Sequence, residues 1–199
     1  MKQPCLVAIN GSPRRQGNCD TLLGIVVQAA AAEGARTELI QAGEVAPEAC
    51  RACSQASGDG RCRFDGGFQI IYERICAADA LVVASPVYFG SVSAQLKAVI
   101  DRFQCHWQAR QRGAIPARQR KRPGAFVCVQ AAGRREFFEN ARFVVRQFFA
   151  TVDTSYSREL FCPGVDAAGS ISRFPDMLAA AADIGRALVA MCRAEQTSQ

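Results

Sequence analysis

The sequence lacks any long hydrophobic run, and this absence argues against a membrane-spanning protein. No apolar stretch among its 199 residues approaches the roughly 18 residues that a membrane helix needs. The apolar stretch near the N-terminus, residues 4–9, is also too short for the apolar region of a secretory signal. We therefore expect a cytoplasmic protein without a membrane partner.

Long polar tracts, internal repeats and linkers are missing as well. With 49% hydrophobic and 21% charged residues, the chain has enough material for one well-packed core. We therefore expect a single domain over residues 1–199. The charge is less informative, because a net charge of +6 suits anionic small ligands as well as nucleic acid.

Histidine is nearly absent, and many of the basic residues gather in one run. The only histidine, His106, lies at the end of a predicted helix and is expected at the surface or an interface, not as a general base. Residues 108–123 hold six basic side chains, which favours a solvated loop or, alternatively, a surface that attracts phosphates or another acidic partner. Aromatic residues are not interleaved with these charges, so we expect no nucleic-acid partner.

Cysteine, in contrast, is abundant, with ten residues. Three of them lie in or beside apolar runs and are predicted to be buried: Cys5, Cys76 and Cys128. Without a secretion signal a disulfide framework is not expected, and a close group of thiols indicates metal or redox chemistry instead. One such group is present: Cys50, Cys53 and Cys62.

Short apolar runs alternate with helical stretches along the whole chain. Four runs have the continuous apolar character of strands buried on both faces, and a fifth is weaker: residues 5–9, 37–41, 79–85, 124–130 and 151–161. Helical stretches fall between and after them: residues 19–33, 68–77, 92–108, 135–150 and 175–194. This alternation predicts an α/β fold, with a doubly wound, five-stranded parallel sheet in the order 2-1-3-4-5 and helices on both faces.

In such a sheet, ligands bind beyond the carboxyl ends of the strands, where the strand order reverses. The loop after the first strand reads "NGSPRRQGNCDTLL", and a strand followed by small polar residues and a helix favours an anion such as phosphate. Several side chains could add hydrogen bonds or charge: Ser12, Arg14, Arg15, Asn18 and Thr21. The alternative is a helix N-cap formed by Asn18 or Cys19 beside a solvated arginine loop.

The spacing of the glycines in this loop excludes two common nucleotide sites. It matches neither G-x-G-x-x-G nor a P-loop, so a dinucleotide fingerprint and a nucleoside-triphosphate site are both disfavoured. The loop after the third strand begins "SPVYFG". Tyr88 and Phe89 present flat apolar faces there, and Gly90 allows close approach of the backbone to a ligand. A planar heterocycle beside a phosphate pocket indicates flavin mononucleotide, FMN.

The segments "GSPRRQGN" and "ADALVVASPVYFGSVSAQLKAVIDR" together resemble the flavodoxin-like NAD(P)H-dependent FMN reductases, including their iron-sulfur flavoprotein relatives. The resemblance extends through "CPGVDAAGSISRFPDMLAAAADIGRALV" near the end of the chain. It implies a flavodoxin-like fold and residues that hold the FMN phosphate: Ser12, Arg14, Gly17, Asn18 and Cys19. Others would line the flavin ring: Pro86, Val87, Tyr88, Phe89 and Gly90. Ala132 and Gly133 would be further neighbours of the ring, although the sequence departs from the family's glycine-rich stretch just after them.

The resemblance also implies an activity and an assembly. The enzyme would take hydride from NAD(P)H and pass electrons to a flavin, a quinone or another small acceptor, as a homodimer or homotetramer. No side chain is predicted to be catalytic, because the flavin carries the chemistry. The acceptor and the choice between NADH and NADPH are left open.

The cysteine group gives a second possible function. In the iron-sulfur flavoproteins a compact four-cysteine motif holds a [4Fe-4S] cluster, and this chain has Ala56 where that motif places its third cysteine. Cys50, Cys53 and Cys62 therefore leave three alternatives, namely an iron-sulfur cluster, a zinc site, or a reduced or disulfide-forming lid loop. The alternative to the reductase function is therefore an electron-transfer or redox-sensing protein that uses the loop of Cys50, Cys53 and Cys62.

Overall fold

The chain forms an α/β fold, seen in a computed structural model that describes residues 2–45, 48–53, 58–64 and 67–197. The parallel strands of the sheet are β1 (Cys5–Asn10), β2 (Arg36–Gln41), β3 (Ala80–Tyr88), β5 (Arg122–Gln130) and β6 (Thr154–Pro163). They are arranged β2-β1-β3-β5-β6, which is the expected order when these five strands are counted along the chain. The sixth strand was not expected, because β4 (Ser91–Val92) is a short antiparallel partner of the end of β3.

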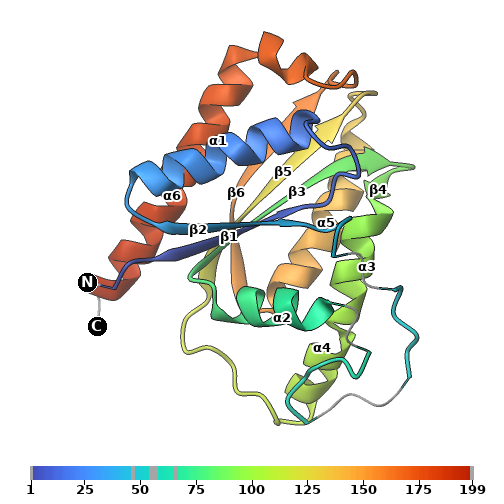
Figure 1. The fold of residues 1–199 in the computed structure, drawn as a ribbon, viewed down its shortest axis with the longest axis vertical. Helices are drawn as coiled ribbons and strands as arrows, with labels where there is room; N and C mark the ends of the chain where they lie inside the picture. The colour runs from blue at the N-terminus through green and yellow to red at the C-terminus, as the bar shows by residue number, and fades with distance from the viewer. Residues whose placement is uncertain (1, 46–47, 54–57, 65–66, 198–199) are drawn as a thin grey trace.

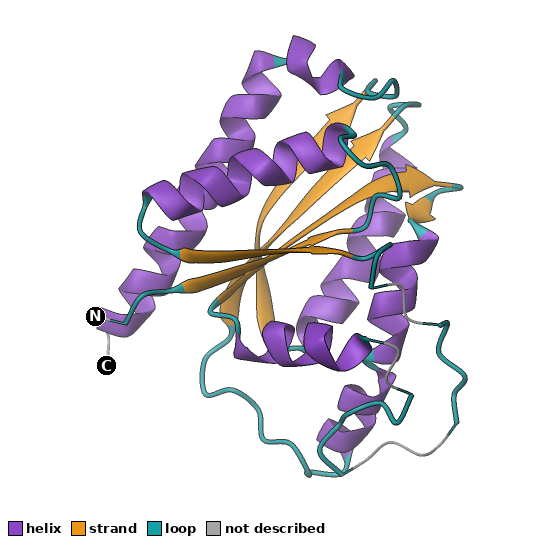
Figure 2. Cartoon of the chain, in the orientation of Figure 1, coloured by secondary structure: helices purple, strands orange, loops and turns teal. Residues whose placement is uncertain are grey.

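Helices cover both faces of the sheet, as the alternating pattern predicted (Figures 1 and 2). On one face lie α1 (Asn18–Ala32) and α6 (Pro175–Thr197). On the other lie α2 (Phe68–Ala77), α3 (Ala94–Arg102), α4 (Gln104–Gln111) and α5 (Arg135–Thr151). A short 3-10 helix, η1 (Ser170–Arg173), precedes α6. No helix in the described ranges has the length and apolar character needed to cross a membrane.

Strand β1 shows why the central runs are apolar without interruption. Val7 and Ile9 point into the core beneath α2 to α5, whereas Leu6 and Ala8 point into the core beneath α1 and α6. Successive side chains of a strand face opposite sides of the sheet, so a strand covered on both faces needs apolar residues at every position.

Several predicted boundaries differ from the structure, among them the end of the third strand and the helix that follows it. Strand β3 continues to Tyr88, because Pro86 still pairs with β5 and the last two residues, Val87 and Tyr88, pair with β4. The predicted helix over residues 92–108 is two helices that meet at Phe103, and the first of them is capped by Ser93, whose side chain accepts a hydrogen bond from the Leu96 amide. Hydrophobic spacing alone does not reveal such a break, because both helices bury the same kind of face.

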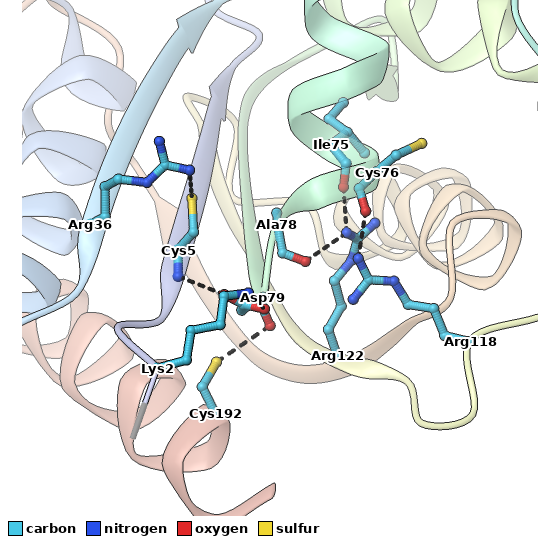
Figure 3. A network of polar contacts seen from close by, with 10 residues as sticks. All are labelled: Lys2, Cys5, Arg36, Ile75, Cys76, Ala78, Asp79, Arg118, Arg122 and Cys192. Atoms are coloured by element: carbon cyan, nitrogen blue, oxygen red, sulfur yellow. Dashed lines mark hydrogen bonds and ion pairs between the residues drawn. The ribbon is translucent and has the colours of Figure 1, made fainter. Parts of the chain in front are cut away.

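The basic run is not simply a solvated loop. Arg122, at the start of β5, is buried and donates hydrogen bonds to the backbone oxygens of Ile75 and Ala78 (Figure 3). It also donates to the backbone oxygen of Val152. Arg118 donates to the backbone oxygen of Cys76 in the same network. The prediction of solvation was wrong for these two residues, because their guanidinium groups bind carbonyl groups left over at the ends of α2 and α5.

His106 also differs from its predicted place. It is only 6% exposed, and its Nδ1 lies 3.0 Å from the hydroxyl of Tyr72. The expectation of a surface histidine was wrong, because α4 turns this side chain inward against Tyr72 and Phe103.

Candidate functional site

The loops after β1 and β3 meet at the carboxyl edge of the sheet. The amide of Gly11 donates to the backbone oxygen of Ala84 at 2.8 Å, and the Ser93 hydroxyl donates to the backbone oxygen of Gly11. A Cβ atom on Gly11 would lie only 2.7 Å from the Cβ of Leu96, so glycine is required for this close approach. The two loops are thus fixed against each other before any ligand is bound.

Short polar contacts hold the loop after β1 in shape. The amide of Ser12 donates to the side chain of Asn10 at 2.9 Å, and the amide of Arg14 donates to the Ser12 hydroxyl at 3.2 Å. Asp20 accepts hydrogen bonds from the Asn10 side chain and from the amide of Gln16. These contacts bind the backbone amides of the loop to side chains of the loop itself and of the adjoining β1 and α1.

The start of α1 is not capped in the way the alternative interpretation predicted. The N-cap residue is Gly17, which has no side chain to cap the helix. Asn18 instead donates from its side chain to the backbone oxygen of Ala167 and accepts from the amide of Ile171, so it ties α1 to the loop after β6. Amides in the first turn of a helix lack intrahelical partners and favour an anion. Because the N-cap residue is Gly17, the interpretation of Asn18 or Cys19 as the N-cap was wrong.

A cavity of about 170 Å³ lies at this edge. Predicted site residues contribute much of its lining: Ser12, Arg14, Gly17, Asn18, Cys19, Pro86, Val87 and Tyr88. The cavity brings the predicted phosphate loop and the predicted ring-binding loop to one space. That these residues bind FMN stays a prediction.

Four of the predicted residues lie outside this lining: Phe89, Gly90, Ala132 and Gly133. Phe89 and Gly90 form the turn of the β3–β4 hairpin, and both have positive φ angles, of 49° and 75°, as a tight two-residue hairpin turn requires. Phe89 is fully exposed as a result. Gly90 packs against the ring of Phe137, while Ala132 and Gly133 are exposed in the loop after β5.

Part of the lining was not predicted from the sequence and comes from the ends of β5 and β6 and the loops after them: Val129, Ala131, Val165, Asp166 and Ala168. Because the carboxyl ends of neighbouring parallel strands meet at one edge of the sheet, the loop after β6 could have been predicted to line the cavity once β6 was identified as a strand. The weak apolar character of β6, which is only partly buried, gave little reason to do so.

The electrostatics of the lining favour an anion near Arg14. The Arg14 guanidinium donates to the backbone oxygen of Asp166 at 3.1 Å and lies 3.7 Å from its carboxylate, which holds the cation beside the cavity. Burial, and then the neighbouring Cys162 and Asp20, raise the pKa of the Cys19 thiol to about 12. Cys19 is therefore a neutral thiol at physiological pH and adds no negative charge to the lining.

The size of the cavity limits what it can enclose. Pockets that enclose drug-sized ligands measure roughly 300–1,000 Å³, so a cavity of about 170 Å³ can take only part of such a ligand. Tyr88, 38% exposed, stands among the lining residues and offers an aromatic ring to the part that stays outside. The donor set fits a phosphorylated planar ligand, with helix-start amides, a hydroxyl and a guanidinium for the phosphate.

The cysteine group lies apart from this cavity, in the loop between β2 and α2. Cys50 and Cys53 are partly exposed and Cys62 is buried, whereas Ala56 lies outside the described residues. In the part of the chain that the structure describes, no three histidine, cysteine or carboxylate side chains stand together as a ready set of metal ligands.

Comparison with known proteins matches residues 4–161 to the model of a family described as NADPH-dependent FMN reductase. An iron-sulfur flavoprotein of Methanosarcina thermophila is 40% identical over 99 residues, which cover 49% of this chain and 51% of that protein. One from Archaeoglobus fulgidus is 28% identical over 130 residues, 65% of this chain and 56% of that protein. The matches thus span about half the length of these curated relatives.

Solved structures share the fold at low sequence identity. A flavone reductase superposes with a TM-score of 0.73 at 18% identity, over 98% of this chain and 65% of that one. The NAD(P)H:quinone oxidoreductase of Methanothermobacter marburgensis gives a TM-score of 0.68 at 15% identity, over 94% of this chain and 98% of that one. These likenesses support the α/β fold.

Proposed function

Because the chain belongs to the NADPH-dependent FMN reductase family, we propose that it binds FMN at the cavity between the loops after β1 and β3 and acts as an NAD(P)H-dependent oxidoreductase. It would take hydride from NAD(P)H and deliver electrons to a small acceptor such as a flavin or a quinone. The observation that carries this proposal is the cavity itself, which joins an anion-binding loop to an aromatic wall at the edge where such folds bind ligands.

The chain's own residues would act by binding and orienting the cofactor. The first-turn amides of α1, the Ser12 hydroxyl and the Arg14 guanidinium would hold the phosphate, which accepts charge-assisted hydrogen bonds. Pro86 and Tyr88 would place the ring at the mouth of the cavity and leave one of its faces open. When bound, FMN supplies the hydride-accepting and electron-donating chemistry, so no acid or base from the chain is required.

The test is a titration of the purified chain with FMN, followed by the quenching of flavin fluorescence. Ala168→Trp should block binding, because Ala168 lines the cavity, whereas Ala167→Trp, one residue earlier and outside the lining, should bind as the native chain does. Steady-state oxidation of NADPH with a quinone or free FMN then tests turnover. Absence of FMN binding by the native chain, or equal binding by both variants, would refute the proposed site.

A second candidate function, electron transfer or redox sensing through the cysteine loop, is favoured by the curated relatives, which are named iron-sulfur flavoproteins. It shares the flavin site and differs in the role of the loop. In Cys50→Ser/Cys53→Ser protein, a reductase would keep its NADPH oxidation with quinone, whereas a protein that needs the loop to pass electrons would lose it. The homodimer or homotetramer stays a prediction and can be measured by light scattering.

A further inference from the structure

A second cavity, of about 220 Å³, lies at the amino end of the sheet between α2, α4 and the loop after α4. Tyr72, His106 and Ile115 are among its lining residues. Gly60 packs against two of them, because a Cβ atom there would lie only 2.4 Å from Ile115 and 2.9 Å from the Tyr72 hydroxyl. We call this space the His106 cavity. It is separate from the candidate flavin site, since none of the described residues lines both.

Tyr72 determines which nitrogen of the His106 ring carries the proton. A phenol has one O–H proton, and the Tyr72 hydroxyl donates it to the backbone oxygen of Asp59 at 3.1 Å. In the 3.0 Å contact between the same hydroxyl and Nδ1 of His106, the histidine is therefore the donor. Burial, and then the Arg110 cation, lower the pKa of His106 and outweigh the opposite effect of Asp153, so the ring is neutral at physiological pH. Nε2 of this neutral ring then has a lone pair and is a hydrogen-bond acceptor.

The Nε2 atom of His106 has no hydrogen-bond partner within the described part of the chain. The residue is buried and borders the cavity, and buried polar atoms are nearly always hydrogen-bonded to the protein or to a bound molecule. A water molecule takes up about 30 Å³ of liquid volume, so the cavity has room for a larger partner. The open acceptor therefore favours a guest that carries an O–H or N–H donor.

The charged groups around the cavity already have partners. Four charged side chains line it: Asp59, Arg118, Arg122 and Asp153. Asp59 pairs with Arg61 at 3.2 Å, and Asp153 pairs with Arg110. Arg118 and Arg122 donate to backbone oxygens at the end of α2 (Figure 3). A charged ligand would have to displace these contacts, so the cavity favours a neutral guest.

The rest of the lining is uncharged and limits the size of the guest. Ile115, Pro116 and Val152 contribute apolar surface. Burial raises the pKa of the Cys76 thiol, so this lining residue is protonated at physiological pH. The volume of about 220 Å³ is below the roughly 300–1,000 Å³ of pockets that enclose drug-sized ligands. A single apolar ring with one hydroxyl or N–H group satisfies both the size and the open acceptor.

We propose that the His106 cavity binds a small neutral aromatic molecule that donates one hydrogen bond to Nε2 of His106, as a phenol does. The ring of this guest contacts Ile115, Pro116 and Val152, and its hydroxyl provides the partner that the fold leaves out. Binding is non-covalent, and no proton or electron is transferred. Because the site lies at the amino end of the sheet, its occupant is distinct from the cofactor of the proposed reaction.

The first test uses phenol as the probe and the nitrogen NMR signals of the histidine ring as the readout. His106 is the only histidine, so in protein without a histidine tag both ring signals belong to it. Without phenol, Nδ1 should be protonated and Nε2 should not. Phenol should shift the Nε2 signal more than the Nδ1 signal and saturate at one molecule per chain. A protonated Nε2 in the free protein, or an Nε2 signal that phenol leaves unchanged, would overturn the proposal.

A second probe, benzene, separates the hydrogen bond from apolar contact, because it has the ring without the hydroxyl. The ratio of phenol affinity to benzene affinity should fall roughly 3- to 10-fold in His106→Phe, which is what a typical hydrogen bond contributes. Comparing the ratio in the two proteins cancels the different hydration of the two probes. An unchanged ratio would contradict the proposed role of Nε2.

Two matched variants of α2 test the location of the site. Cys76→Phe should fill the cavity and abolish phenol binding, because Cys76 lines it. Ala77→Phe, at the next residue, is exposed and outside the lining, so this variant should bind phenol as the native chain does. Equal binding by both variants, or no phenol binding by the native chain, would refute the site. FMN titration of the same proteins should be unchanged, which distinguishes a failure of this proposal from a failure of the proposed function.

Discussion

The two ends of the sheet are both rich in hydrogen-bond donors, but they use them differently. At the amino end, the buried Arg122 donates to the backbone oxygens of Ile75 and Ala78 (Figure 3) and also to Thr154 and the backbone oxygen of Val152. At the carboxyl end, the N-cap residue of α1 is Gly17, which offers no side-chain cap, and this glycine lines the cavity. A group of cationic side chains is thus not in itself a ligand site. It can bind a ligand only where its N–H donors are not already hydrogen-bonded within the chain.

Cavity size alone does not identify a ligand site, because a larger cavity lies at the amino end of the sheet. A space of about 570 Å³ at the amino end is lined by Asp79, Arg118 and Arg122 among others, and it is larger than the candidate site. The Asp79 carboxylate accepts from the Cys5 amide at 2.9 Å and pairs with Lys2, so it too has partners within the chain. These contacts connect β1, β3, β5, α2 and α6, which makes this end a structural junction (Figure 3).

The largest expected effect comes from removing the central cation of this junction. Arg122→Met should lower the free energy of unfolding by about 3 kcal/mol or more, because the carbonyl groups of Ile75, Ala78 and Val152 lose a buried partner. Denaturant unfolding measures this loss. Arg112→Met, an exposed arginine of the same run, should change stability by no more than about 0.5 kcal/mol.

The contrast between the ends predicts how FMN binding responds to the same variant. The folded fraction of Arg122→Met should bind FMN with native affinity, because the junction lies at the opposite end of the strands from the cavity. A large loss of FMN affinity without loss of stability would show that the amino end, and not the carboxyl end, serves the ligand.

The strand runs and the carboxyl-edge loops could be predicted from the sequence because their signals are local. A strand buried on both faces is apolar at each position, and the glycine and proline positions of "GSPRRQGN" and "SPVYFG" mark turns. The buried state of Arg122 and His106 could not be predicted, because it depends on partners 30 or more residues away: Thr154 for Arg122 and Tyr72 for His106.

The next largest expected effect comes from removing the cation at the cavity. Arg14→Ala should weaken FMN binding about 10-fold, or about 1.4 kcal/mol, because one charge-assisted contact to the phosphate is lost. Arg15→Ala is the matched control, since Arg15 pairs with Glu44 and does not line the cavity. Equal effects of the two variants would mean that only the net charge of the loop matters.

The smallest expected effect is a pH dependence at the amino end, carried by Asp153. Burial raises the pKa of this carboxyl, but hydrogen bonds from the Arg118 amide and the Arg110 guanidinium outweigh burial and hold the pKa below its usual range. A lowered pKa in the folded state means that the unfolded chain binds the proton more readily. Asp153 therefore contributes stability above the ordinary aspartate pKa, and this contribution disappears as the pH falls through its lowered value.

Asp153→Asn removes that contribution and keeps the backbone, because asparagine tolerates the positive φ of 52° at this position. At neutral pH the variant should be less stable than the native chain by about 1 kcal/mol, the value of a typical hydrogen bond. The difference should shrink as the pH falls below about 4, the ordinary aspartate pKa. Asp183→Asn, in an exposed pair with Arg186, should show no such change. A constant difference between Asp153→Asn and the native chain at all pH values would mean that shape, and not charge, is what Asp153 contributes to the junction.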